Sequence, residues 1–220
     1  MTRPAKRTNH KNSSKGATKR PLSELAQERS IETRRRLILA AAGLFRDKGY
    51  KGTTLRDIAD AIDMEAGSLY YYFDSKEELL HEILDRGIAA VANAVRDGLE
   101  ALPSEAGPIA RLREAIRAAL HAHLDTDGYT TAYTRIYVQL PPNVKRRDHP
   151  RRLAYIAYWR QLVMDAQRAG NIKAGLPVDA FVNFMLGALS RTSEWHNPQE
   201  RSIDELASLF ADWILEGIAA

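Results

Sequence analysis

The sequence predicts an all-α protein of about nine helices. From Ser23 onward, apolar residues recur at intervals of three and four, which is the period of one helix face. Three capping boxes, in which Ser or Thr stands three residues before an acidic residue, mark helix starts: Thr54–Asp57, Ser75–Glu78 and Ser202–Glu205. Residues 127–142 also suit a strand, but no second strand is available to pair with them, so a helix ending before Pro141 is expected.

In the first third of the chain, the pattern predicts four helices. The first ends at Gly49, a residue type that suits the position after a helix, and the second is opened by Thr54. A break at residues 63–65 leads into the third, "GSLYYYF" at residues 67–73, and Ser75 opens the fourth. The buried face of the first two would carry Leu37, Ile38, Ala41, Ala42, Leu44, Phe45, Leu55, Ile58, Ala59 and Ile62.

The rest of the chain predicts helices separated by Pro and Gly. One covers residues 108–124 with Pro108 in its first turn, and residues 149–170 form a long helix closed by Gly170. Two strongly apolar helices follow, over residues 177–196 and 202–218.

Composition restricts the possible functions. The chain has no cysteine, which excludes disulfides, thiolate metal sites and a cysteine nucleophile. It has no apolar run long enough to cross a bilayer and no signal peptide, so a cytoplasmic protein without a membrane partner is expected. His121 and His123 stand two apart on a helix and cannot share a metal. Phosphate-loop, dinucleotide and nucleophile-elbow motifs are absent, so we expect no enzyme, metal or cofactor.

The positive charge is concentrated at the N-terminus. The first 20 residues carry seven cations and no acid, whereas the remainder carries 25 cations and 28 acids. Residues 1–22 are therefore expected to be a disordered basic tail, either a solvated leader or a segment that contacts phosphate.

The tyrosine segment raises the question of what its outward side chains contact. Leu69 and Phe73, four apart, would hold the segment to the core, so the three tyrosines would point elsewhere. Two short helices joined by three residues form a helix-turn-helix, and small residues let the second helix approach a DNA groove. The alternative is an ordinary helical corner with surface tyrosines, which the eight cations and nine acids of residues 21–75 favour.

Residues 31–84 resemble the DNA-binding domain of the TetR family of transcriptional repressors, through "ILAAAGLFRDKGYKGTTLRDIADAI", "GSLYYYF" and "SKEELL". The resemblance implies a DNA-binding domain over residues 23–75 and an effector-binding and dimerisation domain over residues 76–220. It departs at Asp63, where the family usually has Gly, and at Tyr72, where it often has His. It implies DNA contacts from Thr54, Arg56, Ala66, Gly67, Ser68, Tyr70, Tyr71, Tyr72 and Lys76, with Thr54 also capping its helix.

The last two helices carry apolar faces too wide for a solvated surface. Such a stripe is usually core, but the family resemblance implies that part of it joins two copies into a homodimer that reads a palindromic operator. The residues proposed for this interface are Phe181, Phe184, Met185, Leu206, Phe210 and Trp213.

Aromatic residues are concentrated in the region between the DNA-binding domain and the C-terminal end of the chain. They pack the core or line a cavity for a small-molecule effector, with an arginine for an anionic group. The candidates are Tyr129, Tyr133, Arg135, Tyr137, Tyr155, Tyr158, Trp159, Arg191 and Trp195. Residues 179–196 also resemble family members that control lipid or sterol catabolism and sense acyl-CoA thioesters. The predicted function is a DNA-binding repressor released by such an effector; a ligand-responsive activator and a helical adaptor remain alternatives.

Overall fold

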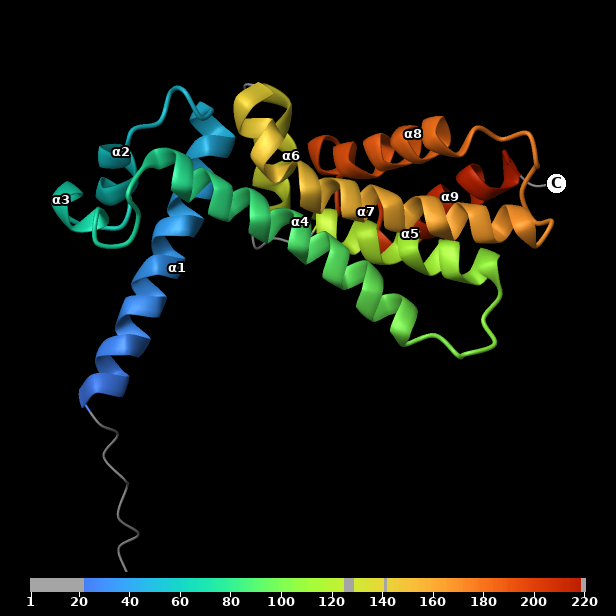
Figure 1. Ribbon diagram of the computed structural model, residues 1–220, viewed down its shortest axis with the longest axis horizontal. Coiled ribbons are helices and arrows are strands. Elements are labelled where there is room, and N and C mark those ends of the chain that lie inside the picture. Colours follow the sequence, from blue (N-terminus) through green and yellow to red (C-terminus); the bar gives the residue numbers. More distant parts are fainter. Residues whose placement is uncertain (1–21, 125–128, 141, 219–220) are drawn as a thin grey trace, which may run out of the picture. The chain divides into compact units, whose positions relative to one another are not determined.

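The computed structural model describes residues 22–124, 129–140 and 142–218, and the regular structure in these ranges is helical, as predicted (Figure 1). The chain divides into two compact units, residues 1–33 and 34–220. The predicted tail lies outside the described residues except for Leu22. The helices are α1 (Leu22–Lys48), α2 (Leu55–Asp60), α3 (Ala66–Leu69), α4 (Lys76–Glu100), α5 (Pro108–Leu124), α6 (Tyr129–Gln139), α7 (Pro142–Arg168), α8 (Val178–Arg191), the 3₁₀ turn η1 (Thr192–Glu194) and α9 (Ile203–Glu216).

Local signals in the N-terminal third act as predicted. Gly49 follows α1 with φ of 76°, the left-handed conformation that glycine adopts without strain. Thr54 and Asp57 form both hydrogen bonds of a capping box at the start of α2. Asp63 ends the turn after α2 with φ of 57°, a conformation that Asp tolerates better than most residues. The chain can therefore dispense with glycine at this corner.

The predicted capping box at the start of α4 is only half correct. The Ser75 side chain accepts a hydrogen bond from the Glu78 backbone N–H, as expected. The Glu78 carboxylate, however, accepts from the backbone N–H of Asp74 at 2.7 Å and not from that of Ser75. Ser75 is therefore the N-cap residue of α4, but the returning hydrogen bond of the box reaches the preceding residue, Asp74, which lies in a bend.

Two predictions for the C-terminal part are confirmed and one is wrong. Helix α5 begins at Pro108, and the ambiguous segment folds as the helix α6. Helix α7, expected from residue 149, begins at Pro142 and continues through Pro150. Pro142 is favourable in a first helical turn, and the helix tolerates Pro150 despite the loss of one backbone hydrogen bond. Residue 149, at which the predicted helix begins, therefore lies inside α7.

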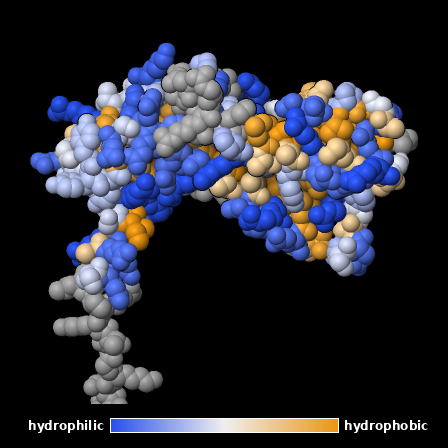
Figure 2. Space-filling model, in the orientation of Figure 1, coloured by the Kyte–Doolittle hydropathy of each residue, from blue (hydrophilic) through white to orange (hydrophobic). Residues whose placement is uncertain are grey.

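Helix α4 is the central element of the C-terminal part. It packs against α5, α6 and α7, while α5 also packs against α9. Gly87 permits the crossing of α4 and α6, because a Cβ atom there would lie 2.5 Å from the Tyr133 Cβ and 2.9 Å from the Tyr129 carbonyl oxygen. The core includes Trp159 from α7 and the buried faces of α8 and α9. Figure 2 shows more apolar surface over these C-terminal helices than over α2 and α3.

Candidate functional site

The tyrosine segment follows a very short helix. Helix α3 has a single turn, and Tyr70, Tyr71 and Tyr72 lie in the tight turn after it. This turn is closed by hydrogen bonds to the Leu69 carbonyl oxygen from the backbone N–H groups of Tyr72 (2.9 Å) and Phe73 (3.1 Å). The predicted recognition helix is thus shorter than its sequence pattern indicates.

Burial separates the side chains of this segment as the sequence predicts, with one difference. Leu69 and Phe73 are buried, whereas Tyr70 is 58% exposed and Tyr71 is 90% exposed. Tyr72 is only half-buried and packs against the core. Two tyrosines, not three, therefore project freely from this turn.

The two cations expected to contact DNA have different surroundings. Arg56 is exposed on α2 and forms no ion pair with another described residue. Lys76 donates hydrogen bonds from its ammonium group to the carbonyl oxygens of Tyr50 and Thr53, each at 2.8 Å. The same ammonium lies 4.3 Å from the centre of the Tyr50 ring. Lys76 thus joins the end of α1 to the start of α4, a role that no sequence motif indicates.

A second ionic cluster connects α1 with α4. The Glu82 carboxylate pairs with Arg34 at 2.9 Å and with Arg86 at 2.8 Å. Burial raises the pKa of Glu82, but the hydrogen bonds from the two arginines outweigh burial and lower this pKa below its ordinary value. The Arg34 guanidinium also lies 4.5 Å from the centre of the Phe73 ring. This cluster, which sequence analysis missed, links α4 to the residue that anchors the tyrosine turn.

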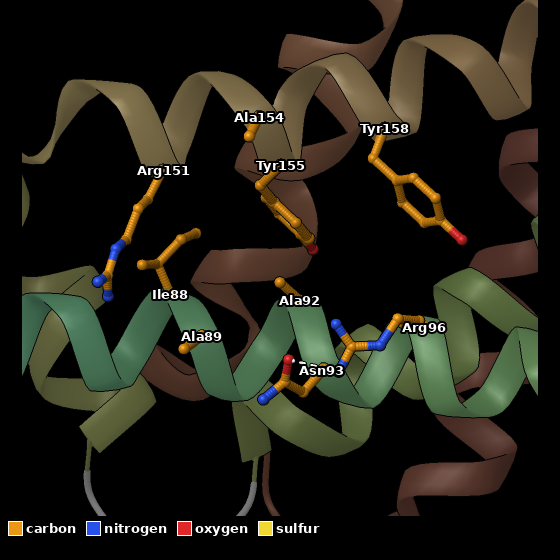
Figure 3. Close-up of a pocket in the computed structure, with 9 residues that line it drawn as sticks. All are labelled: Ile88, Ala89, Ala92, Asn93, Arg96, Arg151, Ala154, Tyr155 and Tyr158. Carbon is orange, nitrogen blue, oxygen red and sulfur yellow. Dashed lines mark hydrogen bonds between the residues drawn. The ribbon is translucent and has the colours of Figure 1, made fainter.

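An outer cavity of about 370 Å³ lies between α4 and α7 (Figure 3). Its walls are mainly apolar, and Figure 3 shows Tyr155 projecting from α7 toward Ala92 on α4. Arg151 and Arg96 lie at opposite ends, paired with Asp85 at 3.2 Å and with Asp97 at 3.6 Å. The complete lining is Ile88, Ala89, Ala92, Asn93, Arg96, Arg151, Ala154, Tyr155 and Tyr158.

An inner chamber of about 100 Å³ adjoins the outer cavity. Ile88 and Tyr155 line both spaces, so their side chains stand between them. The chamber is more polar than the outer cavity, and five helices contribute to it. Its other lining residues are Val91, His123, Tyr133, Arg152, Asn183, Leu186, Gly187 and Ser190.

The predicted effector residues divide into two groups. Tyr133, Tyr155 and Tyr158 line these cavities, whereas Trp159 is enclosed by protein and lines neither. Tyr129 and Tyr137 also lie outside both linings, beside the guanidinium groups of Arg86 and Arg152. The side chain of Arg135 lies outside the described part of the chain.

Arg191 and Trp195, also predicted to bind the effector, line neither of these two cavities. Arg191 pairs with Glu194 at 3.1 Å, and the exposed ring of Trp195 stacks on Phe210 with 6.2 Å between ring centres. Both residues follow Ser190, which is the last residue of α8 that lines the inner chamber.

The residues proposed for the dimer interface also divide by burial. Phe184 is 71% exposed on α8 and Trp213 is 62% exposed on α9. Phe181 and Phe210 are each 9% exposed, at the edge of the core. The prediction that Met185 and Leu206 contact a partner is wrong, because neither side chain retains more than 2% of its surface within the protomer.

Sequence analysis missed most of the outer cavity. Its α4 wall consists of small and aliphatic residues that carry no chemical signal of their own, such as Ala89 and Ala92. The sequence excludes His123 as a metal ligand together with His121 but does not indicate that its buried ring lines the inner chamber. Only the relative rotation of α4, α5 and α7, which sequence periodicity does not specify, brings these residues together.

Two protein families match this chain, one near each end. Residues 37–83 match the family described as "Bacterial regulatory proteins, tetR family", and residues 105–218 match "Tetracyclin repressor-like, C-terminal domain". The HTH-type transcriptional repressor KstR2 of Rhodococcus jostii strain RHA1 is 27% identical over 195 residues, which cover 85% of this chain and 91% of the relative. The activator FasR of Mycolicibacterium smegmatis is 30% identical over about half of each chain.

Solved structures give the same result for the fold. The ketosteroid transcriptional regulator KstR2 of Mycobacterium tuberculosis superposes with a TM-score of 0.72 at 25% identity, covering 86% of this chain and 95% of that chain. AibR in complex with isovaleryl coenzyme A and operator DNA also superposes with a TM-score of 0.72, at 23% identity, covering 82% and 97%. None of the helices in the described ranges combines the length and apolar character that crossing a bilayer requires.

Proposed function

Because this chain belongs to the TetR family of transcriptional regulators and is not an enzyme, we propose that it is a homodimeric repressor that a small-molecule effector releases from a palindromic operator. The observation that carries this proposal is the tyrosine turn. Two large aromatic side chains, Tyr70 and Tyr71, are held in solvent by the buried anchors Leu69 and Phe73. Tyrosine is enriched at interaction surfaces because its ring is apolar and its hydroxyl can form a hydrogen bond.

DNA binding would combine the tyrosines with a small number of cations. A tyrosine ring can pack on a sugar or a thymine methyl group while its hydroxyl bonds a phosphate or a base edge. Arg56, exposed on α2, is the best-placed cation for a phosphate or a base. Lys76 uses two of its ammonium hydrogens on backbone carbonyl groups, so at most one remains for phosphate. We expect Lys76 to act mainly by fixing the angle of α4.

Dimerisation would cover the exposed aromatic residues of α8 and α9. Trp195, Phe210 and Trp213 form a continuous row with ring centres 6.2 and 6.1 Å apart, and Phe184 adds a further exposed ring. Aromatic residues dominate the energetics of protein interfaces because each buries a large area. A two-fold dimer formed through this face would present two tyrosine turns to the two halves of a palindrome.

The effector would bind between α4 and α7. An apolar space with an arginine at each end suits an amphipathic anion, whose apolar part enters the cavity while its charged part remains near Arg96 or Arg151. An acyl-CoA thioester has this character, since its acyl chain is apolar and its nucleotide carries phosphates. The CoA ester bound to AibR in a related fold is consistent with this class.

Helix α4 would transmit the signal, because it lines the cavity at one end and starts beside the tyrosine turn at the other. An anion that binds Arg151 would compete with Asp85 for this cation. Asp85 lies one residue before Arg86, which holds Glu82 and through it Arg34. Displacing these ion pairs would change the angle of α4 and the spacing of the two tyrosine turns, provided that the effector prefers the altered conformation.

Titration of the DNA upstream of the protein's own coding sequence, at several salt concentrations, tests the proposal against the adaptor alternative. A repressor should bind this DNA more tightly than a scrambled duplex, and its affinity should fall as salt rises. Equal binding to both duplexes would favour an adaptor with a vestigial motif. An activator, the function named for FasR, would bind equally well, so a reporter gene must decide the sign of regulation.

A further inference from the structure

The inner chamber contains polar atoms that no described residue satisfies. His123 Nδ1 and the Tyr155 hydroxyl are both shielded from solvent, and neither has a hydrogen-bond partner among the described residues. A buried polar group left without a partner costs roughly 1–3 kcal/mol, so native proteins rarely retain two in one small space without a reason.

A cation faces the same chamber. Arg152 lines the chamber, donates a hydrogen bond to the Tyr133 hydroxyl at 3.3 Å, and forms no ion pair with another described residue. Its guanidinium lies 4.8 Å from the centre of the Tyr137 ring, so an aromatic ring accompanies the charge where a carboxylate would normally be expected. Five N–H donors on one guanidinium exceed what a single hydroxyl can accept.

The protonation states leave the chamber rich in donors. Burial lowers the pKa of His123 to about 4, so the imidazole is neutral near pH 7. Burial also raises the pKa of Tyr155, so its hydroxyl remains protonated and can donate. A chamber with a guanidinium and a phenol as donors is suited to an oxygen atom that accepts hydrogen bonds.

The position of the chamber determines which part of an effector could reach it. The chamber adjoins the outer cavity at Ile88 and Tyr155, and its Tyr155 hydroxyl is shielded from solvent, whereas Arg96 and Arg151 at the ends of the outer cavity are exposed. Its volume of about 100 Å³ is much smaller than the 370 Å³ of the outer cavity, so it suits a terminal group of a ligand whose main part lies in the outer cavity. The tip of a ligand that fills the outer cavity would therefore enter here.

From this arrangement we propose that the effector carries a hydrogen-bond-accepting oxygen, as a ketone or a carboxylate, at the end remote from its anionic head. Tyr155 and Arg152 donate to this oxygen, and His123 completes the chamber. The proposal rests on the proposed function and narrows it: the ligand is an oxygenated acyl thioester and not a plain fatty acyl thioester. An unsubstituted hydrocarbon tip would remove water from these groups without replacing its hydrogen bonds.

Calorimetric titration with three CoA thioesters of equal chain length tests this selectivity. The probes are octanoyl-CoA, 7-oxooctanoyl-CoA and the mono-CoA ester of octanedioic acid. We expect at least one oxygenated probe to bind the wild-type protein about tenfold or more tightly than octanoyl-CoA. The better of the two identifies the accepting group as a ketone or a carboxylate.

Two variants assign the selectivity to the chamber. Tyr155→Phe removes only the hydroxyl and should reduce the preference for the better oxygenated probe over octanoyl-CoA several-fold. Tyr50→Phe removes a tyrosine hydroxyl outside both cavities and should keep the wild-type preference.

Failure of this inference differs from failure of the proposed function. Equal binding of all three probes would overturn the inference and would mean that water satisfies the chamber, while an acyl-CoA response would still stand. An unchanged preference in Tyr155→Phe would likewise overturn the role of the chamber. If no probe binds, both the acyl-CoA effector and the inference fail.

Discussion

Tyr71 is the most exposed of the three consecutive tyrosines, and its replacement tests the tyrosine turn most simply. We expect Tyr71→Ala to weaken operator binding roughly tenfold, within the range of one good base contact. The thermal unfolding temperature should be unchanged, because the side chain contributes little to the core. Fluorescence anisotropy with labelled upstream DNA measures the first quantity and circular dichroism the second. Leu153→Ala, which truncates an exposed side chain on α7, is the control; an equal effect there would contradict the assignment.

The buried imidazole of His123 makes stability depend on pH. Its pKa is lowered to about 4 in the folded protein by burial, below the ordinary value of an unfolded chain. The unfolded state therefore binds more protons between these two values, so stability falls as pH falls through this window. From pH 8 to pH 5 the loss should be about 2 kcal/mol, taking an unfolded pKa of about 6.5.

Urea unfolding of the wild-type protein and of His123→Leu at both pH values isolates this contribution. The variant has no imidazole at this position, so its stability should fall by about 2 kcal/mol less than that of the wild type over the same interval. Equal losses in the two proteins would mean that His123 is not held neutral by burial.

At the level of helices, the crossing of α4 and α6 depends on one missing side chain. Gly87→Ala would place a Cβ atom 2.5 Å from the Tyr133 Cβ, so α6 must move away from α4. We expect a loss of about 1–3 kcal/mol in stability, the usual cost of overpacking. Effector binding should also weaken, because Tyr133 lines the inner chamber.

The matched control for this substitution is Gly43→Ala on α1, where a Cβ atom meets nothing within 4 Å. This change should stabilise the protein by about 0.5–1 kcal/mol, because alanine is the better helix former. Thermal unfolding of both variants compares them. If Gly87→Ala is as stable as Gly43→Ala, the helices are not in close contact at this crossing.

How far the sequence predicts each helix depends on whether its signal is local. Thr54 and Asp57 act within one turn, and so do Ser202 and Glu205; both capping boxes are confirmed. The Glu78 carboxylate bonds a different backbone group because the path of the preceding chain decides which N–H it meets. The start of α7 was missed because Pro150, a residue that normally begins or breaks helices, lies within the helix.

The candidate sites show the same distinction between local and tertiary information. Exposure of Tyr70 and Tyr71 follows from their positions between the inward residues Leu69 and Phe73. The cavities follow from the packing of α4 against α5, α6 and α7, which no spacing along the chain encodes. Arg191, a predicted effector residue, therefore lines neither cavity, whereas Ile88 and Ala92, which carry no chemical signal in the sequence, line the outer one.

For the molecule as a whole, the proposed dimer depends on the aromatic surface of α8 and α9. Trp213→Glu would place a charge in the centre of this surface, and burial of an unpaired charge is strongly unfavourable. We expect the variant to sediment as a monomer and to lose specific operator binding, because one tyrosine turn alone reads only half of the site. Leu153→Glu introduces the same charge on α7 and should remain a dimer; if both variants stay dimeric, the interface lies elsewhere.

In the proposed mechanism, one ligand-responsive dimer occupies one operator. The most direct measurement is sedimentation of the protein with its upstream duplex, before and after addition of 7-oxooctanoyl-CoA and the mono-CoA ester of octanedioic acid. We expect two protomers per palindromic site, and dissociation of the complex by an effector that favours the released state by about 10⁴-fold for near-complete switching. A complex that contains one protomer, or one that none of these thioesters releases, would contradict it.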